Sequence, residues 1–99
     1  MSEEKVIVAG WFTVDPGKRD AVVESFKDLM LRARSFPGCL DLAITADPLH
    51  PGRVNNFELW ESAEALNAFR AVANPPAKIT PMLHVEMQKH AIRESGPPF

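Results

Sequence analysis

Asn56 and Trp60 are the side chains of this sequence whose types and spacing suggest chemistry. They are four residues apart in segment 53–61, which has the pattern of a strand. Because side chains alternate along a strand, Asn56, Glu58 and Trp60 share one face. An amide and an indole on a face that helices cover are able to hold a flat aromatic substrate. In the alternative interpretation, Trp60 fills the core and Asn56 satisfies a backbone group, because buried aromatic side chains mostly serve packing.

The histidines and the single cysteine are residue types able to act as metal ligands, bases or nucleophiles. His84 and His90 share a face of a predicted strand but lie about 20 Å apart, too far to bind one ion together. His84 with Glu86 lacks a third ligand, so no metal site is predicted. His84 is the general-base candidate if it lines the pocket, and otherwise lies on a polar face near a dimer seam or in solvent. Cys39 has no histidine beside it and is not predicted to be a nucleophile.

Composition limits the class of protein. The chain of 99 residues has room for one domain, and 45% hydrophobic with 24% charged residues is typical of a globular protein. A net charge of −2 gives no electrostatic case for nucleic acid, and no apolar run is long enough to predict a membrane partner. The first residues lack the pattern of a secretory signal, and one cysteine excludes an internal disulfide. A soluble, cytoplasmic protein is therefore expected.

Strand and helix patterns alternate along the chain. Strands are predicted at 5–14, 39–46, 53–61 and about 82–92, and helices at 15–34 and 62–74. Asp15 is the predicted N-cap of the first helix, with Pro16 at its first position, and Ser62 is the predicted N-cap of the second. The core-facing stripes of the two helices are predicted to be Val22, Val23, Phe26, Leu29, Met30 and Ala33, and Leu66, Phe69, Val72 and Ala73.

The order β-α-β-β-α-β predicts an α+β, ferredoxin-like fold with a four-stranded antiparallel sheet and both helices on one face. The first strand is apolar on both faces, so the face without helices also requires a cover. A second copy of the chain is the economical cover, and a homodimer is therefore predicted.

The step Trp60-Glu61-Ser62, followed by Glu64-Ala65-Leu66 in a helix, resembles the antibiotic biosynthesis monooxygenase (ABM) domain. The resemblance covers residues 5–93 and leaves a C-terminal tail, 94–99. It implies a dimeric α+β barrel, in which two sheets pack against each other.

The resemblance also implies an activity. In the cofactor-independent members that oxidise polyketides, an Asn and a Trp four apart on the third strand line the pocket, and Asn56 and Trp60 reproduce that spacing. Such members oxidise an anthrone or phenol with O2 and without metal or flavin. The substrate enolate or phenolate itself gives an electron to O2, and an Asn amide is suited to stabilise the oxyanion. The implied activity is a cofactor-independent monooxygenase acting on a small aromatic, phenolic or quinol-like substrate.

Phe26, Met30 and Phe69 are the predicted apolar contacts of that substrate. Phe69 also stands where many relatives carry a histidine on the second helix, and Phe69-Arg70 offers no axial ligand for haem. Haem degradation is therefore not predicted. An isomerase, a quinone-modifying relative and a non-catalytic dimeric module that binds a small molecule remain as alternatives.

Overall fold

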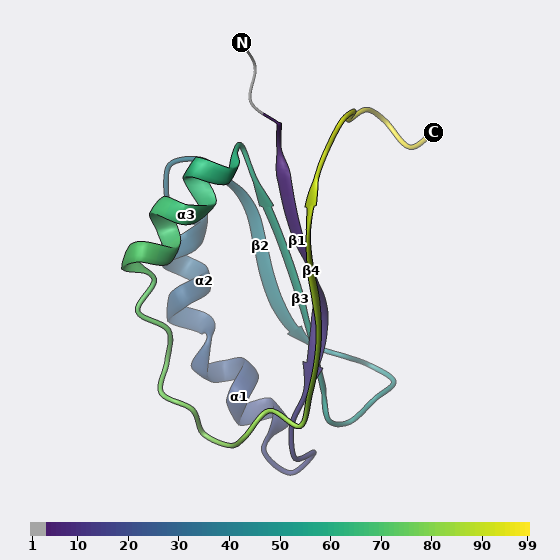
Figure 1. The fold of residues 1–99 in the computed structure, drawn as a ribbon. Coiled ribbons are helices and arrows are strands. Elements are labelled where there is room, and N and C mark those ends of the chain that lie inside the picture. The colour runs from purple at the N-terminus through teal and green to yellow at the C-terminus, as the bar shows by residue number, and fades with distance from the viewer. Residues whose placement is uncertain (1–3) are drawn as a thin grey trace.

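Three helices lie on one face of a four-stranded antiparallel sheet in the computed structural model, which describes residues 4–99 (Figure 1). The elements in chain order are β1 (Val6–Thr13), α1 (Arg19–Ser25), α2 (Lys27–Arg34), β2 (Cys39–Ala46), β3 (Arg53–Trp60), α3 (Ala63–Val72) and β4 (His84–Ala91). The strand order β2-β3-β1-β4 places β3 and β1 at the centre. The predicted α+β, ferredoxin-like fold is confirmed, while the barrel with a second copy stays a prediction.

The register of the central strands decides which side chains meet. On β1, Val8 pairs with Glu58 and Gly10 with Asn56, and on its other side Gly10 pairs with Met87. Paired residues of an antiparallel sheet point to the same face, so all of these lie beneath the helices. The buried side chains of that face are Val6, Val8, Phe12, Leu42, Ile44, Val54, Asn56 and Trp60.

The first predicted helix is divided at Phe26 into α1 and α2. The Ser25 hydroxyl donates a hydrogen bond to the Val22 carbonyl at 2.6 Å. In a regular helix, that carbonyl would accept the Phe26 N–H. That N–H instead donates to the Val23 carbonyl at 3.1 Å, which tightens one turn. The predicted stripe nevertheless faces the core, because Val22, Leu29 and Ala33 are buried and its other members pack against them.

Two details of the helix prediction are wrong. α1 begins at Arg19 and not at Asp15, because residues 15–18 form a turn in which the Asp15 carboxylate accepts the Gly17 N–H at 2.9 Å. Val72 is 61% exposed and does not belong to the apolar stripe of α3. The predicted cap of that helix is confirmed, since the Ser62 hydroxyl accepts the Ala65 N–H at 3.1 Å.

The β2–β3 hairpin is held by buried and half-buried polar groups. The Asp47 carboxylate accepts a hydrogen bond from the Asn55 side chain and two more from backbone N–H groups of the loop, which lower the pKa of Asp47 to about 2. Arg19 donates to three carbonyl oxygens of the hairpin at 3.0–3.1 Å. These contacts attach α1 to the end of the sheet and fix the helix layer over β3.

Among residues 4–99, no helix or loop covers the opposite face of the sheet (Figure 1). Phe57, at its centre, is 38% exposed, and Trp11 of β1 is half-buried there. Among the described residues, none of the helices combines the length and the apolar character that a membrane span requires.

Candidate functional site

Three polar side chains of β3 form a hydrogen-bonded row beneath the helices. The Trp60 indole Nε1–H donates to Glu58 Oε1 at 3.0 Å, and the Asn56 amide Nδ2–H donates to Glu58 Oε2 at 3.1 Å. Trp60 is 0% exposed and Asn56 is 9% exposed, whereas Glu58 is half-buried. The two predicted residues therefore do share one covered face, and the residue between them joins them. We call this set the Asn56–Glu58–Trp60 row.

Glu58 is the functional candidate that the sequence interpretation missed. Strand alternation placed it on the same face, but an isolated glutamate in a strand is usually a solvated residue. The signal available in the sequence was its position halfway between two hydrogen-bond donors. Only the structure shows that both donors turn toward its carboxylate.

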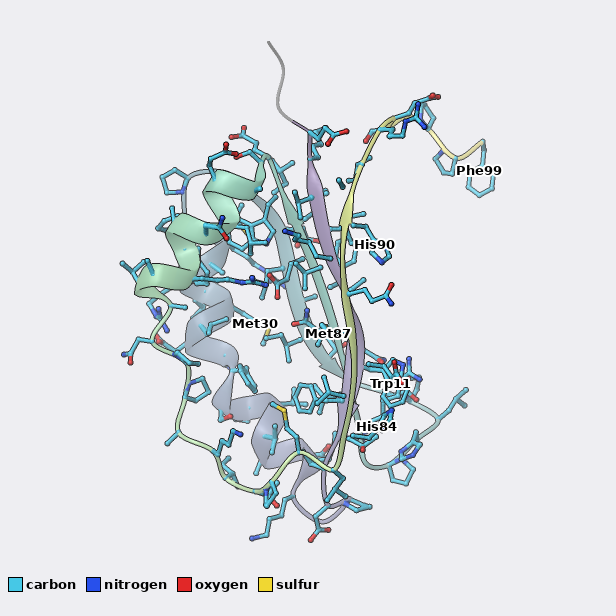
Figure 2. The ribbon with its side chains drawn as sticks, viewed as in Figure 1. Trp11, Met30, His84, Met87, His90 and Phe99 are labelled. Atoms are coloured by element: carbon cyan, nitrogen blue, oxygen red, sulfur yellow. The ribbon has the colours of Figure 1, made fainter. Side chains whose placement is uncertain are left out.

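Asn56 has a second partner across the sheet. Its amide also donates to the sulfur of Met87 at 3.5 Å, which is a weak hydrogen bond because a thioether is a weak acceptor. The two side chains reach each other across Gly10, which has no side chain and a φ of 155°. Figure 2 shows that Met87 and Met30 both point into the space between the sheet and the helices. The predicted apolar wall residue Met30 thus lies on the same side of the sheet as the row.

Aromatic and sulfur groups surround the Trp60 end of the row. The Phe69 ring lies 5.5 Å from the Trp60 ring between centroids, so Phe69 makes an apolar contact with Trp60. Cys39 pairs with Trp60 across β2 and β3. Burial raises the pKa of the Cys39 thiol, and the negative charges of Glu58 and Asp41 raise it further. A protonated thiol is a poor nucleophile.

Two grooves lie on the helix side, one toward each end of β1. The apolar groove is lined by Phe12, Phe26, Ile79 and Met82 among others, and its volume is about 30 Å³. The Lys89 groove is lined by Glu4, Val6, Ala63, Glu64, Lys89 and Ala91, and its volume is about 280 Å³. The strand register places the Asn56–Glu58–Trp60 row between these two grooves. Phe26, a predicted substrate contact, belongs to the apolar groove.

His84 lies on the opposite face of the sheet. Figure 2 shows His84, His90 and Trp11 on the side away from the helices. The His84 ring lies 5.3 Å from the Trp11 ring, and its Nε2 is 3.0 Å from Glu86 Oε1. Within one chain, His84 is therefore not joined to the Asn56–Glu58–Trp60 row, and it occupies the polar face that was the alternative prediction.

Metal-binding side chains do not converge in the part of the chain that the structure describes. Among residues 4–99, no three His, Cys, Asp or Glu side chains are arranged to hold a metal ion. The pair His84 and Glu86 supplies two donors on the open face.

The fold and the covered polar row define a class of protein, and sequence comparison gives its family. The profile of the antibiotic biosynthesis monooxygenase family matches residues 5–73. This match covers more than half of the chain, so the chain belongs to the ABM family. The resemblance drawn from the Trp60-Glu61-Ser62 step is thereby confirmed. The match ends before β4, and the domain limits 5–93 and 94–99 stay predictions.

Solved structures share this fold. A candidate antibiotic biosynthesis monooxygenase from Chloroflexus aurantiacus is 22% identical with a TM-score of 0.69, covering 94% of this chain and 97% of that one. A second candidate, from Bacillus cereus, is 21% identical with a TM-score of 0.67 and covers 97% and 98%. A protein from Pseudomonas aeruginosa is 16% identical with a TM-score of 0.73 and covers 93% and 97%. At these identities the similarity establishes the fold alone. Among curated protein sequences, none is significantly similar to this chain.

Proposed function

We propose that this protein is a cofactor-independent monooxygenase that oxidises a small aromatic, phenolic or quinol-like substrate with O2. The observation that carries the proposal is the pair of buried N–H donors, Asn56 and Trp60, which share the helix-covered face of β3. Membership of the ABM family supports it, and the resemblance implies an Asn–Trp pair of this spacing in the cofactor-independent members. Donors fixed in a partly dry site stabilise negative charge on a substrate oxygen more strongly than water does.

Asn56 is placed to supply such a donor. One of its N–H groups is directed only at the Met87 sulfur, 3.5 Å away, and an oxygen atom of the substrate is a better acceptor than a thioether. In the proposal, an oxygen of the bound substrate replaces the Met87 sulfur as the acceptor of this N–H group. The Trp60 indole N–H, at the other end of the row, is the second donor, and its ring forms an apolar wall with Phe69.

The reaction proceeds from the substrate anion. The enolate or phenolate transfers an electron to O2, and the two radicals combine into a peroxide on the substrate carbon. For an anthrone, the CH2 group between the rings becomes a carbonyl that contains one oxygen atom. The second oxygen atom leaves as water with the two hydrogens of that CH2 group. The site contributes the stabilisation of the anion and the exclusion of bulk water.

Oxygen consumption tests this function directly. Protein dialysed against a chelator is expected to consume one O2 per anthrone oxidised and to yield the quinone, with the rate unchanged by added metal ions or flavin. An oxygen electrode and chromatographic analysis of the product measure both quantities. A rate that depends on an added metal or flavin would contradict the proposal. Tight binding of an aromatic ligand without any oxygen uptake would favour the non-catalytic binding module.

The functional unit is proposed to be a homodimer formed through the open face of the sheet. This face contains Ile7, Ala9, Trp11, Phe57 and Leu59 by strand register. Trp11 lies beneath the Arg53 guanidinium at 4.6 Å, and Trp and Arg are residue types that dominate many interfaces. A second copy that covers this face completes the barrel of the ABM fold.

Phe57→Asp is expected to yield a monomer. The new carboxylate would be buried without a cation at the centre of the interface, which we expect to weaken dimerisation by about 3 kcal/mol or more, roughly 100-fold in Kd. Sedimentation equilibrium at micromolar concentration measures the shift. Leu31→Asp is the matched control, because Leu31 is 63% exposed on α2, on the helix side. A wild-type protein that is a folded monomer, or a Phe57→Asp variant as dimeric as Leu31→Asp, would contradict the dimer proposal.

A further inference from the structure

We propose that Glu58 is the proton acceptor of this site, and that the substrate is therefore an acidic enol or phenol whose hydroxyl group is conjugated to a carbonyl. The inference rests on the proposed function, because it names the group that generates the anion which O2 oxidises. It concerns a residue that the family resemblance does not single out. Two observations carry it: the hydrogen bonds of the carboxylate and the charges around it.

Two hydrogen bonds hold the Glu58 carboxylate in a fixed position on the helix side of the sheet. One oxygen accepts the Trp60 N–H at 3.0 Å and the other accepts the Asn56 N–H at 3.1 Å. Both donors are neutral, so the carboxylate keeps its full charge. Each carboxylate oxygen has two lone pairs, and its donor uses one of them. Each oxygen is therefore still able to accept a proton. Glu58 is half-buried, whereas its two donors Asn56 and Trp60 are buried.

No cation neutralises this charge nearby. Among residues 4–99, no lysine, arginine or histidine forms an ion pair with Glu58. Its direct neighbours across the sheet are Val8 on β1 and Leu42 on β2, both apolar.

The other titratable and charged groups on this side are few. Lys89 lies one strand further, beyond Val8, in the wall of the Lys89 groove, and Cys39 lies on β2. Arg34 on α2 donates to the Leu42 carbonyl at 2.8 Å. α3 presents the apolar side chains Leu66 and Phe69 to the core. A carboxylate that has no ion-pair partner and accepts from two neutral donors repels an anionic substrate and favours a neutral one that can give up a proton.

The strength of this base limits the substrate class. A carboxylate is a weak base and a simple phenol is a weak acid, so proton transfer from a simple phenol to a carboxylate is strongly unfavourable. Conjugation to a carbonyl spreads the charge of the anion over two oxygens and makes the hydroxyl far more acidic. In the step itself, the substrate O–H bond breaks, the proton forms a bond to a Glu58 oxygen, and the electron pair stays on the substrate. The N–H groups of Asn56 and Trp60 then face a neutral carboxylic acid and the new oxyanion beside it, and the oxyanion is the better acceptor.

The experiment uses para-substituted phenols of graded acidity, ending with 4-nitrophenol, whose anion absorbs at longer wavelength than the neutral form. Wild-type protein is titrated below the pKa of each free probe, and the spectrum of the bound probe is recorded. The more acidic probes are expected to bind as anions to wild-type protein and as neutral phenols to Glu58→Gln. Glu61→Gln is the matched control, because it removes an equal charge from an exposed residue three positions along the chain. Glu58→Asp, which keeps the acid one methylene shorter, is expected to restore part of the anionic spectrum.

Turnover provides the second measurement. Glu58→Gln is expected to lower kcat/KM for an enolised 1,3-dicarbonyl by about 100-fold or more, the usual contribution of a general base. Thermal melts of Glu58→Gln and Glu58→Asp establish that both variants are folded.

The outcomes separate this inference from the proposed function. If Glu58→Gln and wild type ionise the bound probe equally, the role of Glu58 is overturned. The same holds if wild-type protein binds these probes only as neutral phenols or binds none of them. If Glu58→Gln oxidises the substrate at the wild-type rate, the monooxygenase survives and Glu58 is not its base. If wild type ionises the probes through Glu58 but consumes no O2, the proton acceptor is correct and the monooxygenase is not.

Discussion

Replacement of Asn56 by Ala is expected to lower turnover of an anthrone or phenolic substrate by about 100- to 1,000-fold, the effect of removing one donor to a developing oxyanion, about 3–4 kcal/mol. The protein should stay folded. The variant loses the hydrogen bonds to the Glu58 carboxylate and to the Met87 sulfur, and a hydrogen bond to a charged group contributes about 1.5–3 kcal/mol. For a chain of this size each kcal/mol corresponds to a fall in melting temperature of about 4–8 °C. Steady-state oxygen uptake and a circular-dichroism melt measure the two effects.

Asn55→Ala is the control for this experiment. Asn55 precedes Asn56 on β3 and faces the other side of the sheet, where its side chain forms hydrogen bonds with Asp47 and Arg53. Its removal is expected to weaken the hairpin and to leave kcat within about twofold, because the side chain is remote from the row. If both variants lose activity equally, or if Asn56→Ala unfolds while activity per folded molecule is unchanged, then Asn56 is a structural residue.

Replacement of Gly10 by Ala is expected to destabilise the fold by about 3 kcal/mol or more, because two independent costs add. Its φ of 155° is one that side-chain-bearing residues rarely adopt. A Cβ at this position would also overlap the carbonyl oxygen of Glu86 and lie 2.7 Å from the Cα of Met87, both in the backbone of β4. Urea unfolding followed by circular dichroism measures the change, and a loss of this size is a large part of the 5–15 kcal/mol that stabilises most domains.

Gly96→Ala is the matched control, since a Cβ there would have no atom within 4 Å. Its stability is expected to stay within about 0.5 kcal/mol of the wild type. Equal unfolding midpoints for the two alanine variants would show that β4 shifts freely at Gly10. The contact between Asn56 and Met87 across this glycine would then not depend on a fixed strand position.

Much of the fold was predictable because the signals are local. Alternation along 53–61 placed Asn56 and Trp60 on one face. Clusters of Pro, Gly and Asp residues predicted the loops that separate the elements. Failures occurred where a side chain competed for a backbone group. Ser25 takes the Val22 carbonyl and divides the first helix, and Asp15 closes a turn where it was expected to cap a helix.

The candidate site was predictable only in part. Asn56, Trp60, Phe26, Met30 and Phe69 lie on the helix side of the sheet or in the helices that cover it, while His84 lies on the other face. Alternation says which residues of one strand share a face. It does not say which face of β4 matches which face of β3, because that depends on pairing through β1, and a shift of one residue would exchange the two faces.

The sequence by itself determined the order of the elements, the apolar stripes and the ABM family, because each depends on neighbouring residues or on short motifs. Only the tertiary structure decided that Glu58 accepts hydrogen bonds from both Asn56 and Trp60, and that Gly10 lets Asn56 approach Met87. Those contacts depend on side-chain rotamers and on the register of three strands distant in the chain. The free energy that selects them comes from packing the helix layer onto the sheet, which no local pattern in the sequence contains.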